Sequence, residues 1–372
     1  MPVVLGELDI IKSLQMLPGV TNNGEGSSGF HVRGGAADQN LVLLDEAIIY
    51  NTSHLLGFFS VFNADAIKDI KLYKGGIPAR FGGRTSSVLD VRQKDGNSKN
   101  FAMTGGIGLI SSRLALEGPM FKEKGSFLIA GRGSYAHLLL KAAGEDNSAN
   151  FYDLNLKTNY NLNGSNQLFL SGYFGRDAFE FGESFNSSYG NLSGNLRWNH
   201  IFNDRLFSNL SLIYSKYDYD LGIVIEEFNW VSSINNYNIK YDLKYYTSEK
   251  FKLDFGASGI YYDFDPGQIL PTSESSEVNP LSLDRKKAFE GALYINAEHM
   301  LTNKLTVQYG LRYSAFSRMG GQAMAEYEDD KPVVYNQLLG IYERGRAIGE
   351  TDYEKSESIK TFGNLEPRVS LA

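Results

Sequence analysis

Residues 191–199, with the sequence NLSGNLRWN, show the pattern that decides the fold class. Leu192, Leu196 and Trp198 fall on one side of an extended chain, whereas Asn191 and Asn195 fall on the other. The same period of two recurs in YNIKYDLKY (237–245), FKLDFGAS (251–258) and LTVQYGLRYS (305–314). These segments are typical of β-strands with one apolar and one strongly polar face.

Strand and connection lengths favour a membrane barrel over a soluble sheet. The alternating runs are roughly 10 to 14 residues long, near the length of a tilted membrane-spanning strand and above the usual ~5–6 residues of globular strands. Short turns are predicted at 163–166, 203–205, 247–250 and 302–304, and long polar loops at 141–150, 177–189, 220–232, 265–287 and 319–360. Short turns at one rim and long extracellular loops at the other are typical of outer-membrane barrels.

About twelve strands are predicted after residue 100, and the last is cut off at residue 372, so we expect the chain to stop partway round a barrel. Six tyrosines near strand ends are predicted to form an interfacial girdle: Tyr217, Tyr219, Tyr245, Tyr246, Tyr261 and Tyr262. The alternative is a soluble sheet in which aromatic side chains pack across strands. The predicted strands are 101–108, 111–118, 126–138, 151–162, 167–177, 190–202, 206–219, 232–246, 251–264, 286–300, 305–317 and one starting near 363.

Composition excludes several classes of protein. The chain has 372 residues, 36 basic and 43 acidic side chains and a net charge of −7, so a basic footprint for nucleic acid is not expected. Cysteine is absent, which removes disulfides, thiolate metal sites and cysteine nucleophiles. No apolar run approaches the ~18 residues of a membrane-spanning helix.

Aromatic residues mark a domain boundary. Only seven of the 48 aromatics lie in residues 1–100. The polar run KDGNSKN (94–100) reads as a linker. We therefore predict one domain over 1–99 and a second over 100–372.

The first domain is predicted to be small and α+β. Apolar residues at near-helical spacing over 5–17 predict a short helix that Pro18-Gly19 ends. Short apolar runs follow at 41–44, 47–50, 70–73 and 87–91, and Asn63 can cap a brief helix over 64–67.

These residues carry a family resemblance. SLQMLPGV (13–20) and the segment from FHVRGG (30–35) through LYKGG (72–76), ARFGGR (79–84) and VRQKDG (91–96) resemble the plug of TonB-dependent outer-membrane receptors of the Bacteroidetes type. LEGPM (116–120) and EPRVSLA (366–372) resemble barrel segments of that family. The resemblance implies an α+β plug inside an antiparallel transmembrane β-barrel of 22 strands, of which about half would be missing. The signal peptide, the energy-coupling box and the regulatory domain of many relatives are not seen, so Met1 is interpreted as the start of a fragment.

The resemblance also implies candidate plug and gating positions. Paired glycines suit close backbone approaches inside a barrel, and plug arginines in the family pair with acidic residues on the barrel wall. The alternatives are ordinary turns for the glycines and solvated side chains for the arginines. Asp45-Glu46 departs from the Asp-Gly turn of many relatives. The candidates are Arg33, Gly34, Gly35, Asp45, Gly75, Gly76, Arg80, Gly82, Gly83 and Arg84.

Motifs for other chemistry are weak. GEGSSG (24–29) fits the dinucleotide pattern by letter but lacks a preceding strand and a following helix, so a flexible loop is favoured. The five histidines share no metal-ligand spacing, and no hydrolase elbow occurs. Acidic and aromatic clusters at 217–220 and 326–330 are interpreted as solvated loops rather than cation sites. We predict no catalytic residue, metal or cofactor, and no ligand-contacting residue can be assigned.

The predicted function is active import of a nutrient across the outer membrane of a Gram-negative bacterium. The implied partners are the TonB energy-coupling complex, outer-membrane lipid, a small-molecule, glycan or peptide ligand, and a surface lipoprotein; no nucleic acid is expected. Iron chelates and vitamins are among the small-molecule ligands that we expect. The alternatives are a passive porin-like barrel and an outer-membrane barrel hydrolase.

Overall fold

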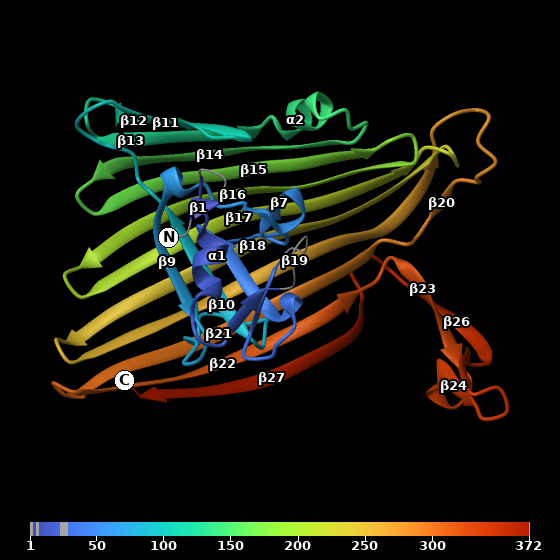
Figure 1. The fold of residues 1–372 in the computed structure, drawn as a ribbon. Helices are drawn as coiled ribbons and strands as arrows, with labels where there is room; N and C mark the ends of the chain where they lie inside the picture. The colour runs from blue at the N-terminus through green and yellow to red at the C-terminus, as the bar shows by residue number, and fades with distance from the viewer. Residues whose placement is uncertain (1–2, 5–6, 23–28, 372) are drawn as a thin grey trace.

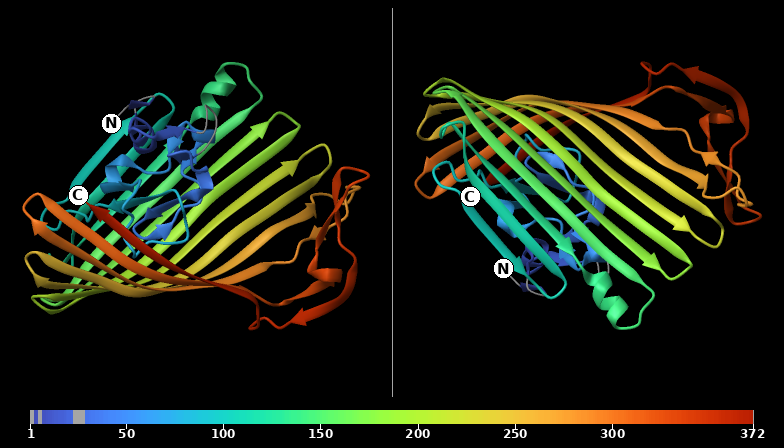
Figure 2. Two further views of the ribbon diagram at one scale, coloured as in Figure 1. Left: turned by 90° about the horizontal axis from the view of Figure 1, so that it is seen from below. Right: turned by 90° about the horizontal axis from the view of Figure 1, so that it is seen from above.

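The computed structural model describes residues 3–4, 7–22 and 29–371. One large curved sheet forms most of the molecule, and the N-terminal residues lie on its concave side (Figures 1 and 2). We call the sheet the wall, and the described residues of 3–93, which lie within the predicted first domain (1–99), the plug. No helix among the described residues is long and apolar enough to cross a membrane.

The wall follows the order of the chain. Its path runs through twelve consecutive antiparallel strands, while β20 (Leu281–Ser282) pairs only with β19, and β11 and β27 are its two edges. Each predicted strand is present, although the last starts at Ser358 rather than near residue 363. The strands are β11 (Ala102–Ile107), β12 (Ser111–Met120), β13 (Gly125–Ser134), β14 (Ser148–Asn163), β15 (Asn166–Phe181), β16 (Phe185–Asn203), β17 (Leu206–Ile223), β18 (Phe228–Ser248), β19 (Phe251–Pro271), β21 (Lys286–Thr302), β22 (Leu305–Met319) and β27 (Ser358–Leu371).

The predicted alternation is confirmed on both faces of the wall. Asn191 and Asn195 are buried against the plug, whereas Leu196 and Trp198 on the same strand are 46% and 40% exposed on the convex side. Leu293 on β21 is 63% exposed in the same way. The convex face is therefore apolar and the concave face polar, the reverse of a soluble protein with a dry interior.

Two predicted long loops are wrong. Pairs continue to Phe181↔Phe185 between β15 and β16, and to Ile223↔Phe228 between β17 and β18. The connections are therefore residues 182–184 and 224–227, and the cluster at 217–220 lies inside β17. The polar residues at these strand ends are paired through their backbone hydrogen bonds. Such pairing extends each strand beyond its apolar stretch and leaves no pattern in the side chains.

The other long connections contain elements of their own. Helix α2 (Ala136–Ala142) replaces the predicted strand end at 135–138, because the apolar run AHLLLKA turns back after β13. Between β22 and β27 two antiparallel pairs and a short 3₁₀ turn project beyond the wall (Figure 1). These are β23 (Gln322–Tyr327), η4 (Glu328–Asp330), β24 (Val333–Asn336), β25 (Ile341–Arg344) and β26 (Ala347–Tyr353).

Tyr217, Tyr219 and Tyr262 do not belong to the predicted tyrosine girdle. Tyr217 and Tyr219 pack on the plug-facing cluster that contains Phe59, and Tyr262 donates a hydrogen bond to Glu290 on the concave face. Neighbouring residues of a strand point to opposite faces, so Tyr261 and Tyr262 cannot both lie in one belt.

The plug is α+β, as predicted. Its four-stranded sheet has the order β6-β5-β10-β9, with β5 and β10 parallel. Asp9 caps α1 by accepting from the Lys12 N–H at 2.8 Å, and Asn63 accepts from the Asp65 N–H at 3.0 Å at the predicted short helix. The elements are β1 (Val3–Val4), β2 (Glu7–Leu8), α1 (Ile10–Gln15), β3 (Val20–Asn22), β4 (Phe30–Val32), η1 (Ala37–Gln39), β5 (Asn40–Leu44), β6 (Ala47–Ile48), β7 (Ser53–His54), η2 (Leu55–Gly57), β8 (Phe59–Ser60), η3 (Ala64–Ala66), β9 (Ile67–Tyr73) and β10 (Ser87–Gln93).

The plug has its own apolar core. Residues from α1, β3, β4, β5, β9, β10 and the segments next to them pack together, among them Ile10, Phe30, Phe62 and Leu89, and Tyr173 of the wall closes this cluster. Helix α1 covers Ile10–Gln15, shorter than the predicted 5–17, and Leu5 lies outside the described residues. A small domain with a closed core can move as a unit, so its contacts with the wall decide where it stays.

Candidate functional site at the plug–wall interface

The turn between β5 and β6 places an acidic residue in a conformation that favours glycine. Leu44 pairs with Ala47, so Asp45 and Glu46 form a two-residue hairpin loop. Their φ angles are 46° and 75°. Positive φ at both positions is the signature of a type I′ turn, in which Asp-Gly is preferred. The departure from Asp-Gly therefore leaves the turn type unchanged and adds a carboxylate at a strained position.

The Glu46 carboxylate lies among cations at the wall. Its Oε1 is 3.3 Å from Arg92 Nη1 of the plug and 3.5 Å from Arg197 Nη1 of the wall. Ser211 of β17 donates to Oε2 at 3.0 Å. Burial would raise the pKa of Glu46, but Lys240, Arg92, Arg197 and the Ser211 hydrogen bond together lower it to about 2. Glu46 is therefore an anion that joins plug and wall.

Asp45 makes a second charged link one residue earlier. Lys157 Nζ on β14 is 3.1 Å from Asp45 Oδ2, and the same ammonium group donates to the Gln93 carbonyl at 3.0 Å. Asn195 Nδ2 donates to the Asp45 carbonyl at 2.6 Å. The Asp45-Glu46 turn is therefore held by β14, β16 and β17 together.

Arginines of the wall also hold backbone carbonyls of the plug. Arg368 donates to the Pro78 carbonyl at 2.8 Å, and Arg312 to the Ala79 and Arg80 carbonyls at 3.5 and 3.4 Å. A Cβ at Gly82 would clash with the Arg312 guanidinium. Gly82 thus allows a close approach of the Arg312 guanidinium and does not adopt a positive φ angle.

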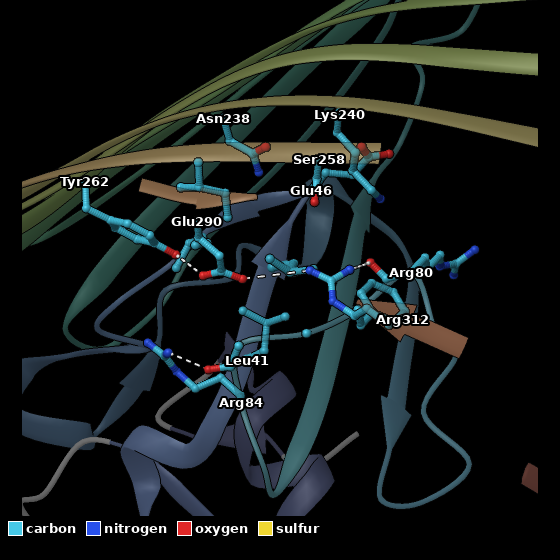
Figure 3. Close-up of a pocket in the computed structure, with 16 residues that line it drawn as sticks. Leu41, Glu46, Arg80, Arg84, Asn238, Lys240, Ser258, Tyr262, Glu290 and Arg312 are labelled. Carbon is cyan, nitrogen blue, oxygen red and sulfur yellow. Dashed lines mark hydrogen bonds and ion pairs between the residues drawn. The ribbon is translucent and has the colours of Figure 1, made fainter. Parts of the chain in front are cut away.

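These groups surround a small cavity of about 70 Å³ between the plug and β18, β19, β21 and β22. Figure 3 shows Glu46, Arg80 and Arg84 of the plug facing Lys240, Tyr262, Glu290 and Arg312 of the wall. Glu290 lies 3.8 Å from Arg312 and accepts from Tyr262. The cavity is lined by these charged groups and by apolar side chains such as Leu41, Ile48 and Phe81.

The polarity of the arginine contacts is the reverse of the one expected. Arg80, predicted to meet a wall carboxylate, lies 3.9 Å from Asp90 of the plug itself, and Arg84 donates to the Gly83 carbonyl at 2.8 Å. The acids of the plug instead meet cations of the wall, through Asp45 and Glu46. Wall cations such as Lys157 and Arg312 are thus plug-contacting residues that sequence reasoning missed, although their positions on the polar strand face were a signal.

The structure brings part of the predicted set together. Arg80, Gly82, Gly83 and Arg84 line the small cavity with Glu46. Gly76 lies against Ser370 of β27, and Gly75 against Arg33 within the plug. Gly34 and Gly35 form a separate turn in which the Gly35 N–H donates to the Val32 carbonyl at 3.0 Å.

A larger cavity of about 590 Å³ opens on the concave side next to Gly83 and Arg84. Phe264, Phe316 and Phe362 line it from β19, β22 and β27, at positions where the wall face is otherwise polar. Arg84, Lys286 and Arg318 also line this space. Its carboxylates are matched by wall arginines, because Glu290 lies 3.8 Å from Arg312 and Glu366 lies 2.6 Å from Arg368.

Other candidate chemistry finds little support. Within residues 3–4, 7–22 and 29–371, no group of three or more His, Asp or Glu side chains is arranged to hold a metal ion. Of the GEGSSG segment, residues 24–28 lie outside the described residues. The acidic cluster at 326–330 is exposed at the end of β23 and in η4.

Comparisons with known proteins agree with this architecture. Residues 5–88 match the family described as the TonB-dependent receptor plug domain. The copper transporter OprC has the same fold over 98% of this chain and 59% of its own, with a TM-score of 0.68 and 10% identity. The FrpB iron transporter from Neisseria meningitidis (F3-3 variant) has a TM-score of 0.65 and 12% identity over 100% of this chain and 61% of its own.

A third structure, the ferric-catecholate import receptor Fiu from E. coli K12 in its open form, has a TM-score of 0.62 and 13% identity over 99% of this chain and 64% of its own. The chain thus spans about three fifths of the length of these structures. No curated protein matches the chain by sequence. The N-terminal part therefore matches the TonB-dependent receptor plug domain, and it lies on an antiparallel wall whose fold is that of these transporter and receptor structures.

Proposed function

We propose that this chain forms the plug (1–99) and part of the barrel wall (100–372) of an outer-membrane transporter in a Gram-negative bacterium. In this proposal an inner-membrane TonB complex supplies the energy and pulls on the plug, while the wall stays in the lipid. Ligand binding alone cannot drive uptake, because a ligand shifts an equilibrium only by its differential affinity for two states.

The observation that supports this proposal is the position of the plug on the wall and the kind of contacts that hold it there. The plug lies on the concave, polar face of a sheet whose convex face is apolar, and wall side chains such as Lys157, Arg197 and Arg312 hold it there through ionic and hydrogen-bonded contacts. Polar contacts can exchange with water when the plug moves, whereas an apolar seat would resist rearrangement. The predicted gating set, from Arg33 to Arg84, is part of this proposal.

The larger cavity supports a finer proposal on the ligand. Three phenylalanines on an otherwise polar face offer apolar contact, and Arg84, Lys286 and Arg318 offer positive charge. We propose an anionic ligand with apolar or aromatic groups, such as an acidic metal chelate, rather than a neutral glycan.

Uptake by cells tests the transport proposal. A strain lacking the full-length gene is compared with its parent for uptake of labelled ferric chelates, a corrinoid, an oligosaccharide and a peptide, with and without a protonophore. We expect energy-dependent uptake of at least one to be lost. Unchanged uptake of all of them would remove the proposal.

Binding by the purified full-length protein tests the ligand class. Arg84→Ala and Arg318→Ala should each weaken binding of a carboxylate-bearing aromatic chelate by roughly 10- to 100-fold, since a hydrogen bond to a charged group contributes about 1.5–3 kcal/mol. Arg205→Ala, at the exposed turn between β16 and β17, is the matched control. Equal affinity in all three variants would contradict the ligand class and leave the transport proposal standing.

Specific observations argue against the two alternative functions, a passive porin and a hydrolase. A passive porin needs an open lumen, whereas the plug here lies on the concave side of the wall (Figure 2). A hydrolase needs a histidine paired with a serine nucleophile. His54, a fully buried histidine, instead lies between two carboxylates.

A further inference from the structure

A buried histidine joins the plug to the wall at a place that the transport proposal does not use. His54 ends β7 and is 1% exposed. Its Nδ1 lies 2.7 Å from Asp177 Oδ2 on β15, and its Nε2 lies 3.3 Å from Asp153 Oδ2 on β14. The imidazole stacks on Phe151 with ring centroids 4.4 Å apart. Carboxylates of the wall therefore meet both ring nitrogens of one plug side chain.

The two carboxylates that contact the His54 ring favour its protonated form. Arg132 on β13 donates to Asp153 Oδ2 at 2.6 Å, so the buried cluster holds two carboxylates and one guanidinium before His54 is counted. An imidazolium donates from both nitrogens and makes the cluster neutral. A neutral ring must turn one lone pair toward a carboxylate, which is unfavourable away from water.

The remaining neighbours do not supply a second positive charge. Tyr173 Oη on β15 is 3.4 Å from His54 Nε2, and Tyr189 Oη on β16 accepts from the Leu56 N–H at 3.3 Å. Gly175 leaves room for this packing, because a Cβ there would clash with Tyr173 Oη. On the plug side, Asp9 accepts from the Ser60 N–H at 2.7 Å and so binds the adjacent backbone rather than the ring.

The contacts fix a whole segment of the plug. Asp177 Oδ1 accepts from the Leu55 N–H at 2.7 Å, and Arg132 donates to the Ser60 carbonyl at 2.7 Å. His54 pairs with Phe59 between β7 and β8. The cluster therefore holds both arms of the 53–60 hairpin on β13, β14 and β15.

We propose that His54 is a proton-dependent pin, whose imidazolium locks the 53–60 hairpin to the wall and whose deprotonation loosens it. In the neutral form the Nδ1–H still donates to Asp177, and Nε2 can accept from Tyr173, so the hairpin loosens without detaching. The inference concerns plug retention and does not depend on which ligand is carried.

The direction of the pH effect follows from linkage. Burial would lower the pKa of His54, but Asp177 and Asp153 outweigh it and raise that pKa. A group with a raised folded-state pKa stabilises the docked hairpin below the ordinary value near ~6.5, and this stabilisation is lost as pH rises through the raised value. The opening constant of the hairpin should therefore rise about tenfold for each pH unit between these two values and become flat above them.

Hydrogen exchange of the full-length protein in lipid or detergent tests the pin. Protection of a peptide covering residues 51–62, corrected for intrinsic exchange, is measured from pH 6 to 10. We expect the tenfold-per-unit loss in the native protein, and His54→Gln should be less protected at pH 6 and independent of pH. His299→Gln, a histidine on β21 that packs on Phe251, should keep the native profile.

Two further measurements keep the test decisive if His54→Gln folds poorly. Asp177→Asn removes one carboxylate and should shift the loss of protection to lower pH. A peptide over β10, in the plug core, should show no such slope in any variant. A flat native profile for residues 51–62, or an unchanged slope in His54→Gln, would overturn the proposal.

Discussion

At the scale of single residues, two opposed effects of Glu46 act on the stability of the docked plug: its backbone conformation destabilises it and its ion pairs stabilise it. A left-handed conformation costs a non-glycine residue about 1–2 kcal/mol. Removing one partner of a buried ion pair costs about 3–5 kcal/mol, because the remaining charges are left unpaired. Arg92 and Arg197 would lose a partner without Glu46, so the ionic contacts should outweigh the strain.

We therefore predict that Glu46→Gly weakens plug seating by roughly 2–3 kcal/mol, even though glycine suits the turn. The exposed Glu123 has a φ of 68° at the β12–β13 turn and is the matched control. Glu123→Gly relieves the same strain without removing a buried anion, so it should be neutral or slightly stabilising. Urea titration of plug hydrogen exchange measures both, and a stabilised Glu46→Gly would contradict the argument.

The pH dependence of Glu46 runs opposite to that of His54. Its pKa is lowered to about 2, so its stabilisation is present above the ordinary carboxyl value of ~4.3 and lost as pH falls through 2. The difference in urea midpoint between the native protein and Glu46→Gln should be constant from pH 7 to 5 and shrink towards pH 2. A constant difference down to pH 2 would mean that the carboxylate is not the group that matters.

At the scale of elements, the close approach of the linker to the wall depends on one glycine. Gly96 is buried between β10 and β11, and a Cβ there would clash with the backbone carbonyl of Phe127 on β13. A backbone atom held in a sheet cannot move aside as a flexible side chain can.

Gly96→Ala should thus destabilise the assembled plug and wall by about 1–3 kcal/mol, the usual cost of overpacking. Gly164, at the exposed β14–β15 turn, has open space around its Cβ position, and Gly164→Ala is the control. The fraction of protein that resists proteolysis near residues 94–101 reports the effect. Equal resistance of the two variants would show that the linker can shift without loss.

Elements were predictable from sequence where side chains alternate, and not where backbone pairing alone sets the limits. The runs around Leu196 and Leu311 identified the strands and their faces. The extension of β15 to Phe181 and of β17 to Ile223 was missed, because polar residues in a ladder resemble those of a loop. The contacts of the site could not be predicted from the sequence, since the pairing of Asp45 with Lys157 joins residues 112 positions apart.

At the scale of the whole molecule, the two faces of the wall differ in polarity. Large apolar side chains cover the convex face, including Leu293 at 63% exposure. A charge on the lipid side of a barrel costs about 2–4 kcal/mol near the bilayer midplane, whereas a charge on the lumen side meets water and polar groups.

Leu293→Arg should therefore slow or prevent folding into lipid vesicles, measured by the shift in gel mobility of the folded barrel. Asn364→Arg, at an exposed position that lines the larger cavity on the concave face, should insert as the native protein does. If both variants insert equally well, the convex face is not the lipid face.

The contacts with plug carbonyls have a consequence for how such proteins diverge. Arg132, Arg312 and Arg368 bind main-chain oxygens, which every amino acid provides. Plug residues at these points can therefore be substituted during evolution without loss of the hydrogen bonds. Substitution of the wall arginines would remove the donors of these bonds. In an alignment of homologues, we expect the wall positions 132, 312 and 368 to vary less than plug positions 60 and 78–80.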